Sequence, residues 1–259
     1  MKNSCCRFAV FVRLLFVCLA LIAHSAIAEQ PMQKGVQHDP TRAYRALVIC
    51  VDRSLSPAEE QFHKLLAVME EIAERDVTYN DLVWLIDIQS SQRPARLFQM
   101  PARNSRRSAG ASAAHGLRDS KSALISAIRD MSQVSGSTDL KDPLDAALDI
   151  LRSHPHATER ILLMGSDFLT DTGSRQVSLE PPKAARKGSA AGVAALLLVT
   201  YPKLQYLRGL RIAPSDLLTN IEAKWTSNLK GRGSSSVTVR LVDSVPISVR
   251  AAALRTPGK

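Results

Sequence analysis

The chain has 259 residues and carries 34 lysines and arginines against 24 aspartates and glutamates, which gives a formal net charge of +10. This length suits one α/β domain with irregular extensions. The basic residues are neither spread along a helix nor interleaved with aromatic side chains, which argues against a nucleic-acid-binding protein. Many of them fall in one polar segment and indicate a solvated surface loop: Arg93, Arg96, Arg103, Arg106, Arg107 and Arg118.

Residues 1–28 have the composition of a cleavable secretory signal peptide. A basic leader precedes an apolar stretch, and Ala26-Ile27-Ala28 places small residues where a signal peptidase reads. The alternative is an uncleaved anchor helix, but the uninterrupted apolar run Leu14–Ala23 is shorter than the ~20 residues that a spanning helix needs. We therefore expect a mature chain that begins at Glu29, has no stable membrane insertion, and is periplasmic or secreted.

Removal of this segment leaves a single cysteine. Cys5, Cys6 and Cys18 lie within it, so Cys50 has no intramolecular partner for a disulfide. An exported chain without disulfides suits the bacterial periplasm better than it suits a small disulfide-stapled toxin. Cys50 falls inside an apolar run, and we expect it to pack as a small buried hydrophobic residue. The net charge of the mature chain is +7, because three cations and no acids are removed.

The first predicted strand, Arg45–Val51, ends in a loop rich in oxygen ligands. Its continuous β-branched run is typical of a buried strand in a parallel sheet. Asp52, Ser54 and Ser56 follow at alternate positions, before a helix start at Pro57. Ligands of open α/β sheets bind outside the carboxyl ends of the strands. A carboxylate and hydroxyls on one short loop suit Mg²⁺ better than Zn²⁺.

The next elements alternate between helix and strand. Apolar residues three and four positions apart predict a helix over 57–75. Apolar runs predict a strand over 81–88 and a short edge strand over 95–100. Residues 101–118 are rich in Arg, Ser and Ala, and we expect a flexible excursion there, before a helix over 120–131.

Further oxygen-bearing residues occur in the second half of the chain. Thr138 lies in the loop Gly136–Leu140, ahead of a predicted helix over 142–152. A fourth strand, 160–164, leads into Asp167. The remaining sequence predicts another flexible excursion, a central strand, a final helix and a last strand, at 171–190, 192–199, 217–230 and 236–242, with polar tails over 29–43 and 244–259.

Strands that alternate with helices at this spacing predict an α/β fold with a sheet covered on both faces. Within that fold, Asp52-x-Ser54-x-Ser56 after a first buried strand, Thr138 on a later loop and Asp167 after the fourth strand resemble a known arrangement. It is the metal-ion-dependent adhesion site (MIDAS) of the von Willebrand factor A (VWA) domain family.

The resemblance covers residues 44–243 and has implications for the fold. It implies a Rossmann-like three-layer sandwich, with a mostly parallel central sheet, one antiparallel edge strand, and helices on both faces. Residues 95–100 fit the edge strand. The resemblance, together with the handedness of the connections, also implies that the first and fourth strands lie together at the centre of the sheet.

The resemblance also implies a function. The five residues would bind Mg²⁺ or Mn²⁺, with the hydroxyls as direct ligands and the carboxylates holding coordinated waters. A carboxylate from a partner protein would complete the coordination shell, so we expect a binding protein and not an enzyme. The chain departs from the family at Phe168, where glycine is usual. A shifted register would place Asp171 in the site instead of Asp167.

Other interpretations stay open. Ser54 and Ser56 could cap the first helix while Asp52 satisfies loop amides. The chain could be a degenerate VWA-like scaffold that has lost the metal and binds through its loops alone. Asp52 could also be the nucleophile of a periplasmic phosphohydrolase, although that class usually has a second carboxylate where this chain has Ser54. Neither a zinc-site histidine spacing nor a Gly-x-Ser-x-Gly elbow occurs in the sequence.

Overall fold

The computed structural model describes residues 41–89, 95–103, 107–135, 138–171, 177–183 and 188–244. The predicted signal peptide lies outside these ranges, as do residues 29–40 and 245–259 of the predicted tails. Within the described ranges, none of the helices has the length and apolar character needed to cross a membrane.

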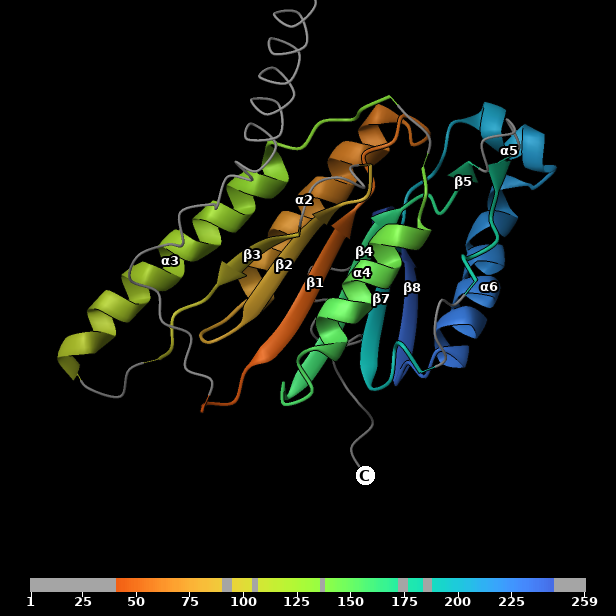
Figure 1. Ribbon diagram of the computed structural model, residues 1–259. Coiled ribbons are helices and arrows are strands. Elements are labelled where there is room, and N and C mark those ends of the chain that lie inside the picture. The colour runs from red at the N-terminus through yellow and green to blue at the C-terminus, as the bar shows by residue number, and fades with distance from the viewer. Residues whose placement is uncertain are drawn as a thin grey trace, which may run out of the picture. The chain divides into compact units, whose positions relative to one another are not determined.

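A six-stranded sheet forms the centre of the fold, with its strands in the order β3-β2-β1-β4-β7-β8 (Figure 1). Every neighbouring pair is parallel except β2 and β3, which makes β3 an antiparallel edge strand. The strands are β1 (Arg45–Val51), β2 (Leu82–Asp87), β3 (Arg96–Gln99), β4 (Glu159–Ser166), β7 (Val193–Val199) and β8 (Ser236–Leu241).

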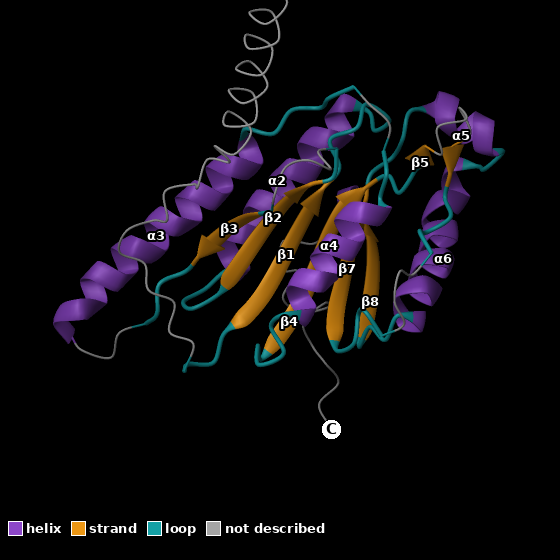
Figure 2. Cartoon of the chain, viewed as in Figure 1, coloured by secondary structure: helices purple, strands orange, loops and turns teal. Residues whose placement is uncertain are grey.

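Helices cover both faces of this sheet (Figure 2). The helices α2 (Glu59–Asp76) and α3 (Arg107–Arg129) pack on one face. The helices α4 (Lys141–Arg152) and α6 (Leu217–Gly231) pack on the other. The result is a three-layer sandwich with two separate hydrophobic cores.

The position of β1 between the two cores explains why its sequence is apolar at nearly every position. Successive side chains of a strand point to opposite faces of the sheet. Ala46, Val48 and Cys50 belong to the core beneath α4 and α6. The residues between and after them belong to the core beneath α2 and α3: Leu47, Ile49 and Val51. Both faces of β1 are therefore buried, and an alternating polar pattern would place polar groups in one of the cores.

The predicted fold class is confirmed. The sheet is mostly parallel, β3 occupies the antiparallel edge, and β1 lies between β2 and β4 as the resemblance implies. Cys50 is fully buried, and this burial raises the pKa of its thiol to about 12. The thiol therefore packs as part of the core, as expected.

One prediction is wrong in the segment between β3 and α4. Residues 107–118 were expected to form a flexible excursion, but they belong to α3, which begins at Arg107 and not near residue 120. Ala113 is buried, and Leu117 packs against the core beneath α2 and α3. A helix that buries alanine shows little apolar periodicity, which is why the sequence pattern did not reveal it.

The expected excursion over 171–190 also contains ordered structure. A short hairpin joins β5 (Thr170–Asp171) to β6 (Val177–Ser178), and Leu179 is buried in the core beneath α4 and α6. Residues 172–176 and 184–187 lie outside the described residues. This part of the chain is therefore anchored by Leu179.

The structure also contains a helix that the sequence pattern did not predict, α5 (Leu204–Leu210), of seven residues. Leu207 is its one buried residue, and seven residues are too few to show a helical repeat in the sequence. Two short 3₁₀ helices complete the secondary structure: η1 (Pro214–Asp216) and η2 (Val242–Ser244).

We expect Gly165→Ala to destabilise the fold, because Gly165 lets α2 lie close to β4. An added Cβ would lie 2.4 Å from Leu65 Cδ1 and 2.5 Å from Met69 Cε, and both side chains are buried. Overpacking of this kind costs about 1–3 kcal/mol. Gly209→Ala is the matched control, because nothing lies within 4 Å of its added Cβ and alanine favours the helix. Equal urea midpoints for the two variants would contradict this account of α2 packing.

Candidate metal centre

The first residue of the loop that follows β1 is hydrogen-bonded to the neighbouring strand β4. The Asp52 backbone N–H donates to the Gly165 carbonyl at 2.9 Å, which fixes the start of the loop against β4. The Asp52 carboxylate is fully buried. Its Oδ1 accepts the Ser54 backbone N–H at 2.9 Å, and its Oδ2 accepts the Ser166 hydroxyl at 2.5 Å. Asp52 is thus held by two strands at the carboxyl edge of the sheet.

Ser54 and Ser56 present their hydroxyls to each other. The two Oγ atoms are 2.8 Å apart, and Ser54 is buried. Helix α2 begins at Glu59, with Ala58 as its N-cap and no side-chain cap hydrogen bond. The prediction of a helix start at Ser56-Pro57, and with it the capping role for these serines, is therefore wrong. Pro57 instead forms a bridge with Pro202.

Thr138 is linked to this loop by Gln89, which lies two residues after the end of β2. Gln89 Nε2 lies 2.8 Å from Thr138 Oγ1 and 3.5 Å from Asp52 Oδ1. Thr138 is itself buried, just ahead of α4. The structure therefore brings Thr138 to the Asp52 loop, although the two residues lie far apart in the sequence.

Asp167 follows β4 directly and is fully buried. Its Oδ1 accepts the Leu169 backbone N–H at 3.0 Å, whereas its Oδ2 has no hydrogen-bond partner among the described residues. Burial, and then the charge of Asp52, raise the pKa of Asp167 to about 8, and the nearby Ser56 hydroxyl offsets this only in part. Burial also raises the pKa of Asp52, against the hydrogen bond from Ser166.

Phe168 explains how the loop keeps its register without the usual glycine. Its φ is 58°, in the left-handed region that favours glycine. The side chain is fully buried and meets Trp225 edge-on, with 4.8 Å between ring centroids. This aromatic contact offsets the backbone strain. The charge of Asp52 acts on Asp167, whereas the side chain of Asp171, the alternative for this position, lies outside the described residues.

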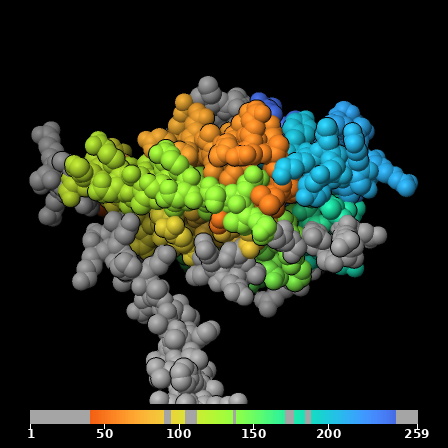
Figure 3. Space-filling view, turned by 90° about the horizontal axis from the view of Figure 1, so that it is seen from above, coloured from red at the N-terminus to blue at the C-terminus, as the bar shows by residue number. Residues whose placement is uncertain are grey.

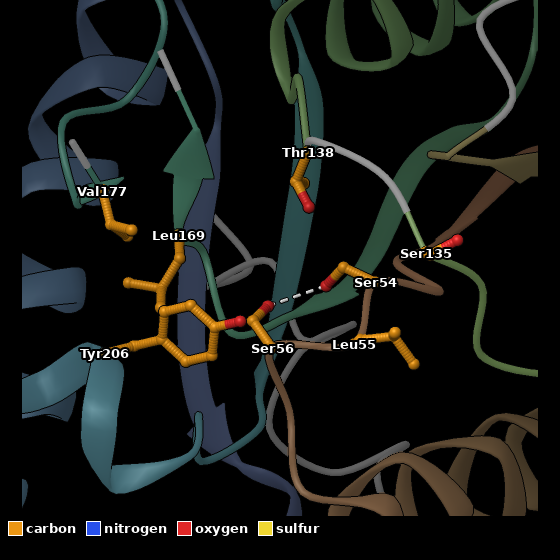
Figure 4. Close-up of a pocket in the computed structure, with 8 residues that line it drawn as sticks. All are labelled: Ser54, Leu55, Ser56, Ser135, Thr138, Leu169, Val177 and Tyr206. Carbon is orange, nitrogen blue, oxygen red and sulfur yellow. Dashed lines mark hydrogen bonds between the residues drawn. The ribbon is translucent and has the colours of Figure 1, made fainter. Parts of the chain in front are cut away.

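The hydroxyl groups open onto a pocket of about 260 Å³ (Figure 4). In this view the Thr138 hydroxyl points towards the two serines across the pocket. The pocket is lined by Ser54, Leu55, Ser56, Ser135, Thr138, Leu169, Val177 and Tyr206. Three of the five predicted site residues therefore line it, while Asp52 and Asp167 lie buried behind them.

Surrounding contacts hold the loop in place. Arg53 pairs with Asp87 at the end of β2, and its Nε donates to the Ser132 carbonyl at 2.6 Å. The Val134 N–H donates to the Arg53 carbonyl at 2.7 Å, and Gln133 Nε2 donates to the Ser54 carbonyl at 2.8 Å. The loop after β1 is thus fixed to β2 and to the segment before Thr138, which favours a preformed site.

The residues fit a hard divalent cation. Neither Asp52 nor Asp167 forms an ion pair with a described residue, so a bound cation would relieve their repulsion. The described residues contain no group of three or more histidine, cysteine, aspartate or glutamate side chains that could hold a metal ion, so the candidate site depends on hydroxyl oxygens beside its two carboxylates. Two carboxylates with three hydroxyls are oxygen donors of the kind that Mg²⁺ prefers.

Sequence reasoning missed two residues of this site. Ser166 donates to Asp52, and Gln89 joins Asp52 to Thr138. Ser166 could have been found, because it directly precedes Asp167 at the end of a strand. Gln89 gave no signal, because its role depends on how β2 lies beside β1.

The site thus belongs to an α/β protein with an oxygen-lined pocket at the carboxyl edge of its sheet. No family model and no curated protein matches the chain. Among solved structures, it is similar to the pilus adhesin SpaC from Lactobacillus rhamnosus GG in an open conformation. That likeness has 11% identity and a TM-score of 0.46, and it covers 81% of this chain but only 29% of the adhesin.

Two further structures are similar to the chain. One is the VWA domain of SpRpn10, with 13% identity and a TM-score of 0.36, covering 79% of this chain and 92% of that domain. The other is an aerotolerance-related membrane protein from Bacteroides fragilis NCTC 9343, with 13% identity and a TM-score of 0.31, covering 60% and 67%. These TM-scores are too low to argue from, so the fold class rests on strand order and register.

We expect the stability of the metal-free protein to fall as the pH rises from about 5 to about 8. The pKa of Asp167 is about 8 in the fold, against an ordinary value of 3.8, so the folded chain holds this proton where the unfolded chain has lost it. The contribution is complete at low pH and is lost as the pH passes through the folded pKa. Melting temperatures measured in chelator should show the fall, and Asp167→Asn should flatten it. An identical profile for the variant would contradict the assignment.

Proposed function

We propose that this chain is an exported VWA-like binding protein that holds Mg²⁺ or Mn²⁺ and uses it to engage an acidic side chain of a partner protein. The observation that carries the proposal is the pair of facing, buried carboxylates, Asp52 and Asp167, which share no basic partner among the described residues. Hydroxyls that open onto a pocket lie beside them. A site of this composition is costly to bury unless a cation binds there.

The hydroxyls and the carboxylates of the proposed site would have different roles. The hydroxyls of Ser54, Ser56 and Thr138 line the pocket and are suited to direct coordination. Asp52 already accepts hydrogen bonds from Ser54 and Ser166, so its remaining lone pairs suit coordinated waters. When bound, the cation supplies a coordination position for a carboxylate oxygen from outside the chain. Few protein charges would reach the cation directly, which leaves it attractive to that carboxylate.

Two alternatives remain distinct from this proposal. A degenerate VWA-like scaffold would use the same loops without a metal. A periplasmic phosphohydrolase would use Asp52 as a nucleophile, but the position of its usual general acid is Ser54, whose hydroxyl contacts Ser56. Metal-dependent stabilisation favours the proposal over the first alternative, and turnover of a generic phosphoester would favour the second.

We expect millimolar Mg²⁺ or Mn²⁺ to raise the melting temperature of the mature protein. A ligand that binds only the folded state adds about 2.7 kcal/mol when it is present at roughly a hundredfold its dissociation constant. Asp52→Ala should abolish the rise, and Ser54→Ala and Thr138→Ala should each reduce it by removing one oxygen. Calorimetry at the same metal concentrations provides the direct measurement.

Ser135→Ala is the matched control for this series. Ser135 lines the same pocket, and its substitution also removes one hydroxyl, but Ser135 is not one of the proposed ligands. Its metal-dependent shift should equal that of the wild type. Asp167→Ala should abolish the shift; if it does not, the site excludes Asp167. An absence of metal binding to the wild type would contradict the proposal and leave the metal-free scaffold.

We also expect export, with the mature chain beginning at Glu29. The expectation rests on the basic leader, the apolar stretch and the Ala26-Ile27-Ala28 signal. N-terminal sequencing of protein from the cell envelope or the medium is the measurement. Recovery of the purified protein with Met1 intact would show that cleavage does not occur.

A further inference from the structure

The pocket beside the proposed cation site has two chemically different walls. The hydroxyls of Ser54, Ser56 and Thr138 form one wall, and Leu169, Val177 and the Tyr206 ring form the other (Figure 4). A cation site needs only the hydroxyl wall. The apolar wall is suited to an apolar group of the ligand that lies beside the ligand's carboxylate.

The pocket is of a size for a side chain. Its volume is about 260 Å³, below the ~300–1,000 Å³ of pockets that enclose a whole small molecule. Leu55, between the two serines, is 43% exposed, and Leu204 at the start of α5 is 60% exposed. Leu55 is one of the residues that line the pocket, so exposed apolar surface lies at the edge of the pocket.

The segment 203–211, which contains α5, adds positive charge beside this pocket. Lys203, Arg208 and Arg211 are exposed, and the segment has no acidic residue. None of the three forms an ion pair with a described residue. Viewed from the carboxyl edge of the sheet, α5 lies next to the loop that follows β1 (Figure 3). On the side of the pocket formed by segment 203–211, the positive charge favours an acidic segment of a partner, whereas the exposed Asp139 lies beside Thr138.

Segment 203–211 is fixed to the cation loop. The Lys203 N–H donates to the Ser56 carbonyl at 2.8 Å, and Lys203 Nζ donates to the Leu55 carbonyl at 2.7 Å. Leu207 anchors the helix in the core beneath α4 and α6. The apolar wall and the hydroxyl wall thus keep one spacing, so that a single ligand segment can engage both.

We propose that Tyr206 is a specificity-determining residue, and that the partner presents an acidic segment in which the metal-binding glutamate or aspartate is followed by a large apolar residue. This inference rests on the proposed function. The acidic side chain faces the cation site, the apolar side chain enters the pocket against Leu169, Val177 and Tyr206, and neighbouring acids face segment 203–211. Apolar anchors of this kind dominate the energy of many interfaces.

The test uses short fluorescein-labelled peptides as probes, read by fluorescence anisotropy in millimolar Mg²⁺. One peptide carries Glu followed by Leu within an Asp-rich sequence, a second replaces that Leu with Ser, and a third replaces the Glu with Gln. The wild type should bind the Glu-Leu peptide at least about fivefold more tightly than the Glu-Ser peptide, in line with burial of part of one apolar side chain. It should bind the Gln peptide as weakly as it binds in chelator.

The variants assign the preference to the pocket. Tyr206→Ser should remove most of the Leu-over-Ser preference while the Mg²⁺-dependent melting shift remains. Leu97→Ser is the control for loss of an apolar surface side chain, because Leu97 is 43% exposed but lies on the edge strand β3. It should retain the full preference.

The possible outcomes separate the two proposals. If the wild type distinguishes Glu from Gln but not Leu from Ser, the cation-binding function stands and the specificity inference is overturned. If Mg²⁺ raises the melting temperature but no peptide binds, the inference is again overturned. If Mg²⁺ has no effect on melting and no peptide binds, the proposed function itself fails. A dimer in sedimentation that is lost in Tyr206→Ser would assign the pocket to a second copy of the chain and overturn the inference.

Discussion

Two carboxylates, Asp52 and Asp167, are buried against each other at the carboxyl edge of the β1–β4 pair. Burial and mutual repulsion both favour the protonated form, which is why the pKa of Asp167 rises to about 8. Such a pair is unfavourable for folding at neutral pH, and only the surrounding donors offset it in part. Many of the surrounding hydrogen bonds and ion pairs hold these two carboxylates in place.

The support comes from several segments at once. Ser166 and the Ser54 amide bind the Asp52 carboxylate, while the Arg53–Asp87 ion pair fixes the loop to β2. Because these contacts come from strand ends, the oxygen atoms of the proposed cation site are held in fixed positions. A binding site that stores electrostatic repulsion in this way gains the most when a positive ion arrives.

The same edge of the sheet also supplies the apolar wall of the pocket. Leu169 lies two residues after Asp167, so the segment after β4 contributes both a carboxylate of the site and part of that wall. Tyr206 comes from α5, whose segment is bonded to the Ser54–Ser56 loop through Lys203. The polar and apolar halves are therefore mechanically linked, which is the physical basis for treating them as one recognition surface.

The sequence alone determined the fold class and the six strands of the central sheet, and it singled out Asp52, Ser54, Ser56, Thr138 and Asp167 as site candidates, because apolar runs and strand-end residues are local patterns that reflect burial. It did not predict the β5–β6 pair or α5. It misplaced the start of α2 and the beginning of α3, where alanine and not a larger apolar residue is buried. Only the tertiary structure decided that Gln89 joins Thr138, 49 residues further on, and that Lys203 meets Leu55, 148 residues earlier. Contacts between segments so far apart depend on how strands and helices pack, and no local pattern encodes that.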